Sequence, residues 1–336
     1  MTEGLDWRQW LADQFAQLSR WFQGRFVFEV GAGDESISAT RMADDGYVRD
    51  LLLKMHEQQQ YGNPEPGSVA ASAERGITIS ASRLTRHYSA ALTTAAITGL
   101  AGGVGFDLAP QNCTMIFASG VPFRLLLGQP PEPAPLLVAL EDVSGIPADV
   151  PRVASRDELR QIVWRNLYGE HLGPLFRRLA TLTKVSPSLL WTNAAEWPAM
   201  IHDAALEYLE PDIGTPLVEE SLAVLNADAL PGVDDLAAPL RDRIEWLKVS
   251  AEEGAETIQT RKMCCLTYLL ADRFGRLCQN CPYLPPEDRV ALAAERHDVA
   301  MGSAGGDAEQ RAIEKGMQRP SIRALLKSAS TRSPSS

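Results

Sequence analysis

The spacing of apolar residues predicts a first lobe in which helices alternate with short strands. Apolar side chains recur near helical spacing over residues 5–24, which predicts an amphipathic helix. Ser82 is placed to cap a later helix that stops at Gly102 and Gly103. The predicted helices of this lobe are 5–24, 46–59 and 83–100, and the predicted strands are 25–30, 76–80, 114–118 and 122–127.

The last two of these strands are predicted to form a β-hairpin, because only the turn-forming pair Ser119-Gly120 and one further residue separate them. The proline-rich stretch 129–135 then breaks the pattern and predicts an interior boundary. Beyond it the periodicity is mostly helical, and Ser155 and Glu158 have the spacing of a capping box. The predicted helices are 156–168, 170–184, 186–207, 214–228 and 236–257.

Hydrophobic density falls after Pro285, and the last 25 residues contain five basic residues and one acidic residue among many serines. That composition is typical of a mobile tail. The predicted fold class is α+β, with an N-terminal lobe of short strands and helices, a mostly helical second half and a C-terminal cysteine-bearing hairpin. The predicted parts are an α+β lobe (1–130), a helical region (136–257), a cysteine segment (258–285) and a mostly disordered tail (286–336).

The overall charge serves only to exclude some classes of binding partner. A net charge of −11 argues against nonspecific binding to nucleic acid or to anionic membranes, because both reward positive surface. The opening residues lack the basic and apolar regions of a signal peptide, and the uncharged run within 88–106 is too weakly apolar to span a bilayer. We therefore expect a cytoplasmic protein with reduced thiols.

Four of the five cysteines lie within eighteen residues, as Cys264-Cys265, twelve intervening residues, and Cys278-Gln-Asn-Cys281. Isolated free cysteines usually scatter as small buried residues, so this clustering indicates a thiolate site for a metal ion or an iron–sulfur cluster. A strand over 266–270, a turn and a returning segment would bring the two pairs together as a hairpin.

The ligand set alone leaves the nature of the centre open. Structural zinc accepts four thiolates, but its usual pattern is two separated knuckles, and adjacent side chains such as Cys264 and Cys265 tend to diverge. A [2Fe–2S] cluster is larger and shares four sulfurs between two irons. A zinc site, an iron–sulfur cluster, and a disulfide or no centre at all are the alternatives.

The cysteine segment, followed by proline, resembles the C-terminal signature of the FhuF-type ferric siderophore reductases. Two upstream stretches also look like that family: the segment from His87 to Asp107, and the segment from His171 to Asn193 with its Val-Ser-Pro-Ser-Leu-Leu-Trp-Thr-Asn run. The resemblance covers roughly residues 80–285. The family pattern has ten residues between the cysteine pairs, and an even-numbered insertion keeps the cysteines of a hairpin on the same face.

The resemblance implies a [2Fe–2S] cluster held by Cys264, Cys265, Cys278 and Cys281, and one-electron reduction of ferric siderophores to release Fe(II). It implies a ferric siderophore as substrate, an electron donor such as a ferredoxin or flavin reductase, no nucleic acid partner, and room for a peripheral contact with the inner membrane. It names no catalytic or substrate-binding residue, no particular siderophore or donor, no oligomeric state and no role for the tail. The alternatives are a noncatalytic four-cysteine zinc interaction protein and a siderophore-biosynthesis enzyme.

Other chemistry-bearing residues favour structural interpretations. The Gly31-Ala-Gly33 turn lacks the third glycine of a nucleotide-binding loop, and Cys113 at the start of an apolar strand is expected in the core. The five histidines form no metal-binding spacing. Arg261 and Lys262, just before the first cysteines, could stabilise the extra negative charge of a reduced cluster or contact a siderophore, but solvated surface charge is at least an equal interpretation.

Overall fold

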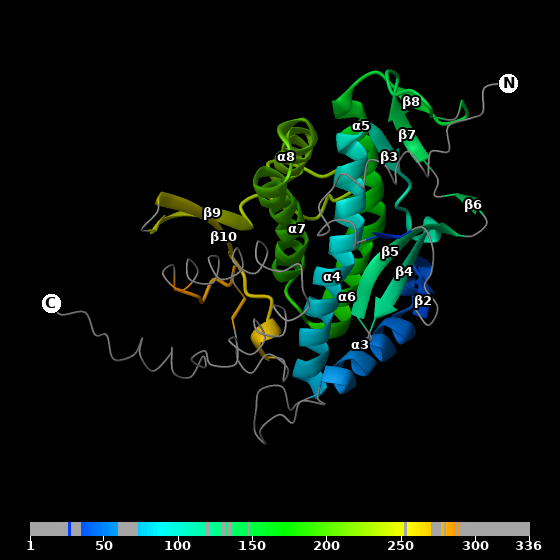
Figure 1. Cartoon of the computed structure of the whole chain (residues 1–336). Coiled ribbons are helices and arrows are strands. Elements are labelled where there is room, and N and C mark those ends of the chain that lie inside the picture. The colour runs from blue at the N-terminus through cyan, green and yellow to red at the C-terminus, as the bar shows by residue number, and fades with distance from the viewer. Residues whose placement is uncertain are drawn as a thin grey trace, which may run out of the picture.

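Helix α4 (Ala73–Ala101) is the central element of the computed structural model, with contacts to α3, α7, α8 and strand β5. Figure 1 shows it between the strands of the first half and helices α7 and α8. Its burial on nearly all sides explains the composition, which is rich in Ala, Ser and Thr, because small side chains let neighbours approach closely. The structure describes residues 26–27, 35–59, 73–118, 121–129, 132–133, 136–146, 148–251, 254–269, 277–278, 280–285 and 288.

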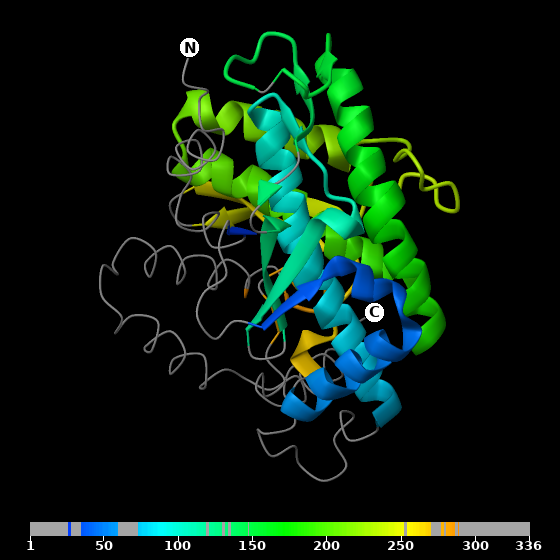
Figure 2. The ribbon, with the colours of Figure 1, turned by 90° about the vertical axis from the view of Figure 1, so that its right-hand side faces the viewer.

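The first half contains two small sheets. The larger has the strand order β1-β5-β4-β2 with β6 paired to β5, and its β4–β5 pair is the predicted antiparallel hairpin. The second sheet has the order β3-β7-β8. Helix α3 confirms the helix predicted at 46–59 and contacts α4 (Figure 2). The bounds are β1 Phe26–Val27, β2 Glu35–Ser38, η1 Ala39–Ala43, α3 Asp45–Gln59, β3 Val104–Phe106, η4 Pro110–Asn112, β4 Cys113–Ala118, β5 Val121–Gln129, β6 Glu132–Pro133, β7 Leu136–Leu140 and β8 Arg152–Val153.

Helices dominate the next hundred residues, as predicted. Ser155 Oγ accepts a hydrogen bond from the Glu158 amide over 3.2 Å, which confirms the predicted N-cap. Helices α5 and α6 are joined without a break by a π-helical stretch rather than by a turn. The bounds are α5 Arg156–Trp164, η5 Arg165–Leu172, α6 Gly173–Thr183, α7 Pro187–Tyr208 and α8 Pro211–Leu225.

The helix predicted over 236–257 is wrong. Residues there form turns and then the antiparallel hairpin of β9 (Ile244–Ala251) and β10 (Gly254–Arg261). Ile244 is buried and Glu245 exposed, and Ile258 pairs opposite Leu247. This alternation has a period of two, which fits a strand and conflicts with a helix.

Three other local predictions are wrong, and the tertiary contacts explain why. Residues 76–80, predicted as a strand, lie inside α4, where burial outweighs the β-propensity of their β-branched residues. Ser82 is therefore in the helix interior and caps nothing. The strand predicted over 266–270 is replaced by the 3₁₀ helix η6 (Thr267–Leu269), which contacts α4.

The remaining predictions lie outside the described residues. These are the helix at 5–24, most of the strand at 25–30, the Gly31–Gly33 turn, the return segment of the cysteine hairpin before residue 277, and the tail from 286 apart from residue 288. Within the described part the fold is α+β, as predicted, and its core joins α3, α4 and the strands to α5–α8. None of the helices described is long and apolar enough to cross a bilayer.

Candidate functional site

The cysteine segment lies against α4 and α7 and begins where strand β10 ends. Cys264 and Cys265 follow the end of this strand after Lys262 and Met263, and η6 follows them beside α4. Figures 1 and 2 show η6 as a short gold helix next to α4. Leu266 has a positive φ of 62°, which is a left-handed conformation that costs a non-glycine residue about 1–2 kcal/mol. Such strain gathers at functional sites, where the surrounding structure maintains it.

The four sulfurs meet in two pairs. Cys265 Sγ lies 3.6 Å from Cys278 Sγ, and Cys264 Sγ lies 3.9 Å from Cys281 Sγ. Cys264 and Cys265 also interact with each other, so the two pairs lie side by side. All four cysteines are free, and all but Cys278, which is partly exposed, are buried.

Each pair has the separation of two thiolates that bind one metal ion. Two sulfurs about 2.3 Å from one tetrahedral ion are about 3.8 Å apart, which is close to the separation within each pair. Thiolate donors in two such pairs fit a dinuclear centre, and the same separation also occurs between the ligands of a single tetrahedral ion. The described part of the chain contains no group of three His, Cys, Asp or Glu side chains placed to hold one ion.

Backbone amides also point at the thiols. The Leu266 amide hydrogen-bonds to Cys264, and the Tyr283 amide hydrogen-bonds to Cys281, each two residues after its cysteine. Cys281 N donates to Cys278 O over 3.0 Å, which closes the Cys-x-x-Cys turn. Hydrogen bonds to sulfur stabilise thiolates and tune the potentials of iron–sulfur clusters.

The thiolate with the most support is that of Cys265. Its pKa is lowered by hydrogen bonds from Cys264 and Cys278 and, against the effect of burial, by the positive charges of Arg261 and Arg86. The Thr267 hydroxyl lies 2.9 Å from Cys265 Sγ. Thiolates are the form that binds metals, so this environment favours a ligand role.

A buried ionic network lies behind the cysteines, and Glu196 of α7 is its centre. The Glu196 carboxylate receives a forked pair of hydrogen bonds from Arg86 (2.7 and 2.8 Å), one from Arg261 (2.8 Å) and one from Asn280 (2.6 Å). The side chains of Glu196 and Arg261 are 0% and 1% exposed. Burial works to raise the pKa of Glu196, but the charges of Arg261 and Arg86 outweigh it and hold the pKa below its ordinary value.

Asn193 connects this network to the cysteine backbone. Its Oδ1 accepts from Arg261 over 3.0 Å, and its Nδ2 donates to the carbonyl and hydroxyl of Ser82. Ser82 Oγ in turn donates to the Cys265 carbonyl over 2.7 Å. We call Arg86, Asn193, Glu196, Arg261 and Asn280 the Glu196 network. It explains physically why the stretch around Trp191–Asn193 bears on the cysteine site.

The interpretation of Arg261 as solvated charge is wrong, since its guanidinium is buried against Glu196, whereas Lys262 is exposed and 3.4 Å from Glu245. Glu196 itself was not among the residues predicted to matter. The signal was present, because Glu196 is the only Asp, Glu, Lys or Arg between residues 185 and 202. A lone charge in an apolar helix must be buried with a partner.

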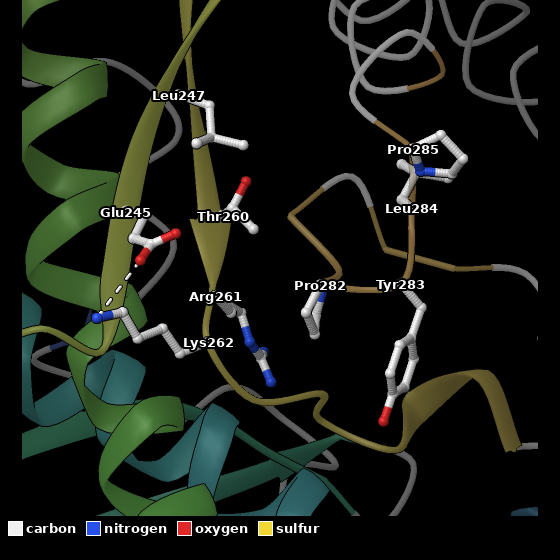
Figure 3. Close-up of a pocket in the computed structure, with 9 residues that line it drawn as sticks. All are labelled: Glu245, Leu247, Thr260, Arg261, Lys262, Pro282, Tyr283, Leu284 and Pro285. Carbon is white, nitrogen blue, oxygen red and sulfur yellow. Dashed lines mark ion pairs between the residues drawn. The ribbon is translucent and has the colours of Figure 1, made fainter. Parts of the chain in front are cut away.

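A groove opens beside the second cysteine pair (Figure 3). It lies between the β9–β10 hairpin and the segment that follows Cys281, and its volume is about 540 Å³, within the range of small-molecule sites. Its charged side chains include the Lys262–Glu245 ion pair, and its most exposed large side chain is Tyr283, at 62%. The lining residues are Glu245, Leu247, Thr260, Arg261, Lys262, Pro282, Tyr283, Leu284 and Pro285.

The fifth cysteine and the histidine of the family-like central segment belong to the core. Cys113 is fully buried, as predicted, and burial raises the pKa of its thiol. His171 Nε2 pairs with the Tyr88 hydroxyl over 2.6 Å, and its Nδ1 pairs with the Leu108 carbonyl over 2.5 Å. Burial lowers the pKa of His171 to about 4, so the imidazole is neutral and structural.

Comparisons with known proteins give a family match and likenesses to solved structures. A search of curated proteins gave no match. Among solved structures, aerobactin synthetase IucC from a hypervirulent pathotype of Klebsiella pneumoniae is 14% identical, with a TM-score of 0.39 over 63% of this chain and 37% of that chain. The chain thus spans little more than a third of that synthetase, and a likeness this low carries no argument.

The family match covers the helices that lie behind the cysteine site. Residues 82–248 match the model described as ferric iron reductase FhuF-like transporter. The matched region begins at Ser82, includes Arg86, Asn193 and Glu196, and ends before the cysteines. It supports a role in ferric iron reduction. On this match, the chain belongs to the FhuF-like ferric iron reductase family.

Proposed function

We propose that this protein reduces ferric siderophores in the cytoplasm, one electron at a time, with a [2Fe–2S] cluster held by Cys264, Cys265, Cys278 and Cys281. The observation that carries the proposal is the pairing of the four sulfurs, at 3.6 and 3.9 Å, on a scaffold of the FhuF-like family. When bound, such a cluster supplies a single electron at low potential.

The chemistry of the substrate matches a one-electron site. Siderophores hold Fe(III) through hard oxygen donors, and Fe(II), with its lower charge, is held far more weakly. Adding one electron to the ferric chelate therefore releases the metal. A separate donor, such as a ferredoxin or flavin reductase, would supply the electron for each turnover.

The groove is the candidate binding site for the ferric chelate. Pro282 and Tyr283 follow Cys281 directly, and Arg261 and Lys262 lie just before Cys264. A ligand in the groove would thus contact residues that flank the Cys264–Cys281 pair. Since the Lys262–Glu245 pair is neutral as a whole, aromatic and hydrogen-bonding contacts from Tyr283 would contribute much of the binding.

Anaerobic purification followed by iron and sulfide analysis tests the proposal. We expect about two irons and two acid-labile sulfides per chain, a red-brown colour, and an electron paramagnetic resonance signal after reduction. Adding a ferric siderophore to the reduced protein should abolish the signal and yield Fe(II) for a ferrous indicator. A colourless zinc protein, or ATP-dependent condensation without Fe(II), would instead identify an interaction protein or a biosynthetic enzyme.

A further inference from the structure

We infer that the Glu196 network positions the cysteine segment and that its net positive charge raises the potential at which the site accepts an electron. This inference rests on the proposed function. It assigns Arg86, Glu196 and Arg261 as positioning residues, which act on the site through the cysteines.

The hydrogen bonds within the network satisfy the buried Glu196 carboxylate at both of its oxygens. The two carboxylate oxygens of Glu196 accept four hydrogen bonds, two at each oxygen, all between 2.6 and 2.8 Å. A forked guanidinium–carboxylate pair also fixes orientation. Because removing one partner would leave a buried charge unpaired, the arrangement is rigid and costly to disturb.

The network contacts the cysteine segment at two places, just before Cys264 and just before Cys281. Arg261 donates from its side chain to the Met263 carbonyl, over 3.2 and 3.3 Å, just before Cys264. Its backbone amide donates to the Asn280 carbonyl over 3.0 Å, just before Cys281. The Asn280 side chain donates a hydrogen bond to Glu196, so Asn280 contacts both Arg261 and Glu196. The network therefore connects the backbone just before Cys264 to the backbone just before Cys281.

The charges of the network do not cancel. Two guanidinium groups and one carboxylate leave a net charge of +1, with Glu196 and Arg261 buried and Arg86 20% exposed. Arg86 and Arg261 both interact electrostatically with Cys265 and Cys278. An electron that enters the site adds one negative charge, which this net positive charge stabilises, and burial of Arg261 and Glu196 makes the effect stronger than in bulk water. The positive charge therefore favours the reduced state.

Redox titrations of the purified cluster-bearing protein, followed by electron paramagnetic resonance, test the sign of the effect. At the wild-type midpoint, we expect Arg86→Gln to lower the ratio of reduced to oxidised protein about tenfold, which is about 59 mV for one electron. Glu196→Gln removes the negative charge and should raise the ratio. Arg86→Lys keeps the charge and should change the ratio less than about threefold. A purely structural role would not give opposite shifts.

Arg160→Gln is the matched control, because Arg160 also forks onto a buried glutamate, Glu220, but joins α5 to α8. It should destabilise the protein without shifting the potential. If Glu196→Gln does not fold, the two Arg86 variants decide. Equal behaviour of Arg86→Lys and Arg86→Gln, in potential or in loss of the cluster, overturns the inference. A wild-type protein without acid-labile sulfide overturns the proposed function instead.

Discussion

The Ser82 hydroxyl donates a 2.7 Å hydrogen bond to the carbonyl of Cys265, which lies 183 residues later in the chain. Ser82 is the first residue of the family match, and Cys265 lies beyond its end. This contact connects the buried face of α4 to the cysteine segment. The cysteine site is therefore built on the FhuF-like helices rather than appended to them.

Replacing Ser82 by Ala should lower the free energy of unfolding by about 1–2 kcal/mol, because the Cys265 carbonyl and the Asn193 amide both lose a partner. Urea titration measures the change. Ser80 is the matched control, since its hydroxyl is equally buried and has no partner among the described residues. Ser80→Ala should be neutral or stabilising, and an equal loss in both variants would contradict the prediction.

Each of the four clustered cysteines should be needed for the cluster. Replacing any one by Ser should reduce bound iron and acid-labile sulfide to well below half of the wild-type content, because an alkoxide is a poorer ligand than a thiolate for this centre. Cys113→Ala is the control and should retain full content, since Cys113 lies in the core. A Ser variant with full content and full activity would remove that cysteine from the ligand set.

Stability should fall in mild acid because of His171. Its pKa is lowered to about 4 in the folded protein, so the unfolded chain takes up the proton first, near pH 6.5. The contribution is fully present above pH 6.5 and is lost as the pH falls toward 4, by about 1.4 kcal/mol per pH unit. Urea midpoints across this range should show a shallower slope for His171→Gln. Parallel slopes would contradict the assignment.

Tyr283→Ala should weaken binding of the ferric chelate without changing the site itself. Loss of an exposed aromatic contact of about 1 kcal/mol would raise KM about fivefold. Iron content and kcat should remain near wild-type values. Leu206→Ala serves as control, because Leu206 is similarly exposed, at 65%, and does not line the groove. A changed kcat with an unchanged KM would place Tyr283 outside the binding surface.

Sequence reasoning was most successful where local chemistry decides the structure. The Ser155 cap, the β4–β5 hairpin and the end of α4 at its two glycines follow from hydrogen bonds and backbone freedom within a few residues. The clustering of cysteines likewise required no tertiary information. Their residue types and spacing were enough to direct attention to residues 264–281.

It failed where distant parts of the chain decide. Ser82 has the position of a helix cap in the sequence, but it lies inside a buried helix. Its hydroxyl donates a hydrogen bond to the Cys265 carbonyl instead. Arg261 looked solvated because Glu196, its partner, is 65 residues away. The pairing of the sulfurs depends on Asn280 and its contacts with α7 and β10. Such long-range contacts leave no periodic trace in a single sequence.

The long separation between Glu196 and its partners also sets an order of events during biosynthesis. The ribosome synthesises α4 and α7 before the cysteine segment. Arg261 and Asn280, which bind Glu196, are added 65 and 84 residues after it. Until they dock, Glu196 is paired with Arg86 alone, and the cysteines lack their contacts with α4 and α7. The proposed cluster can therefore form only in chains translated past Cys281, because shorter chains lack part of the proposed ligand set.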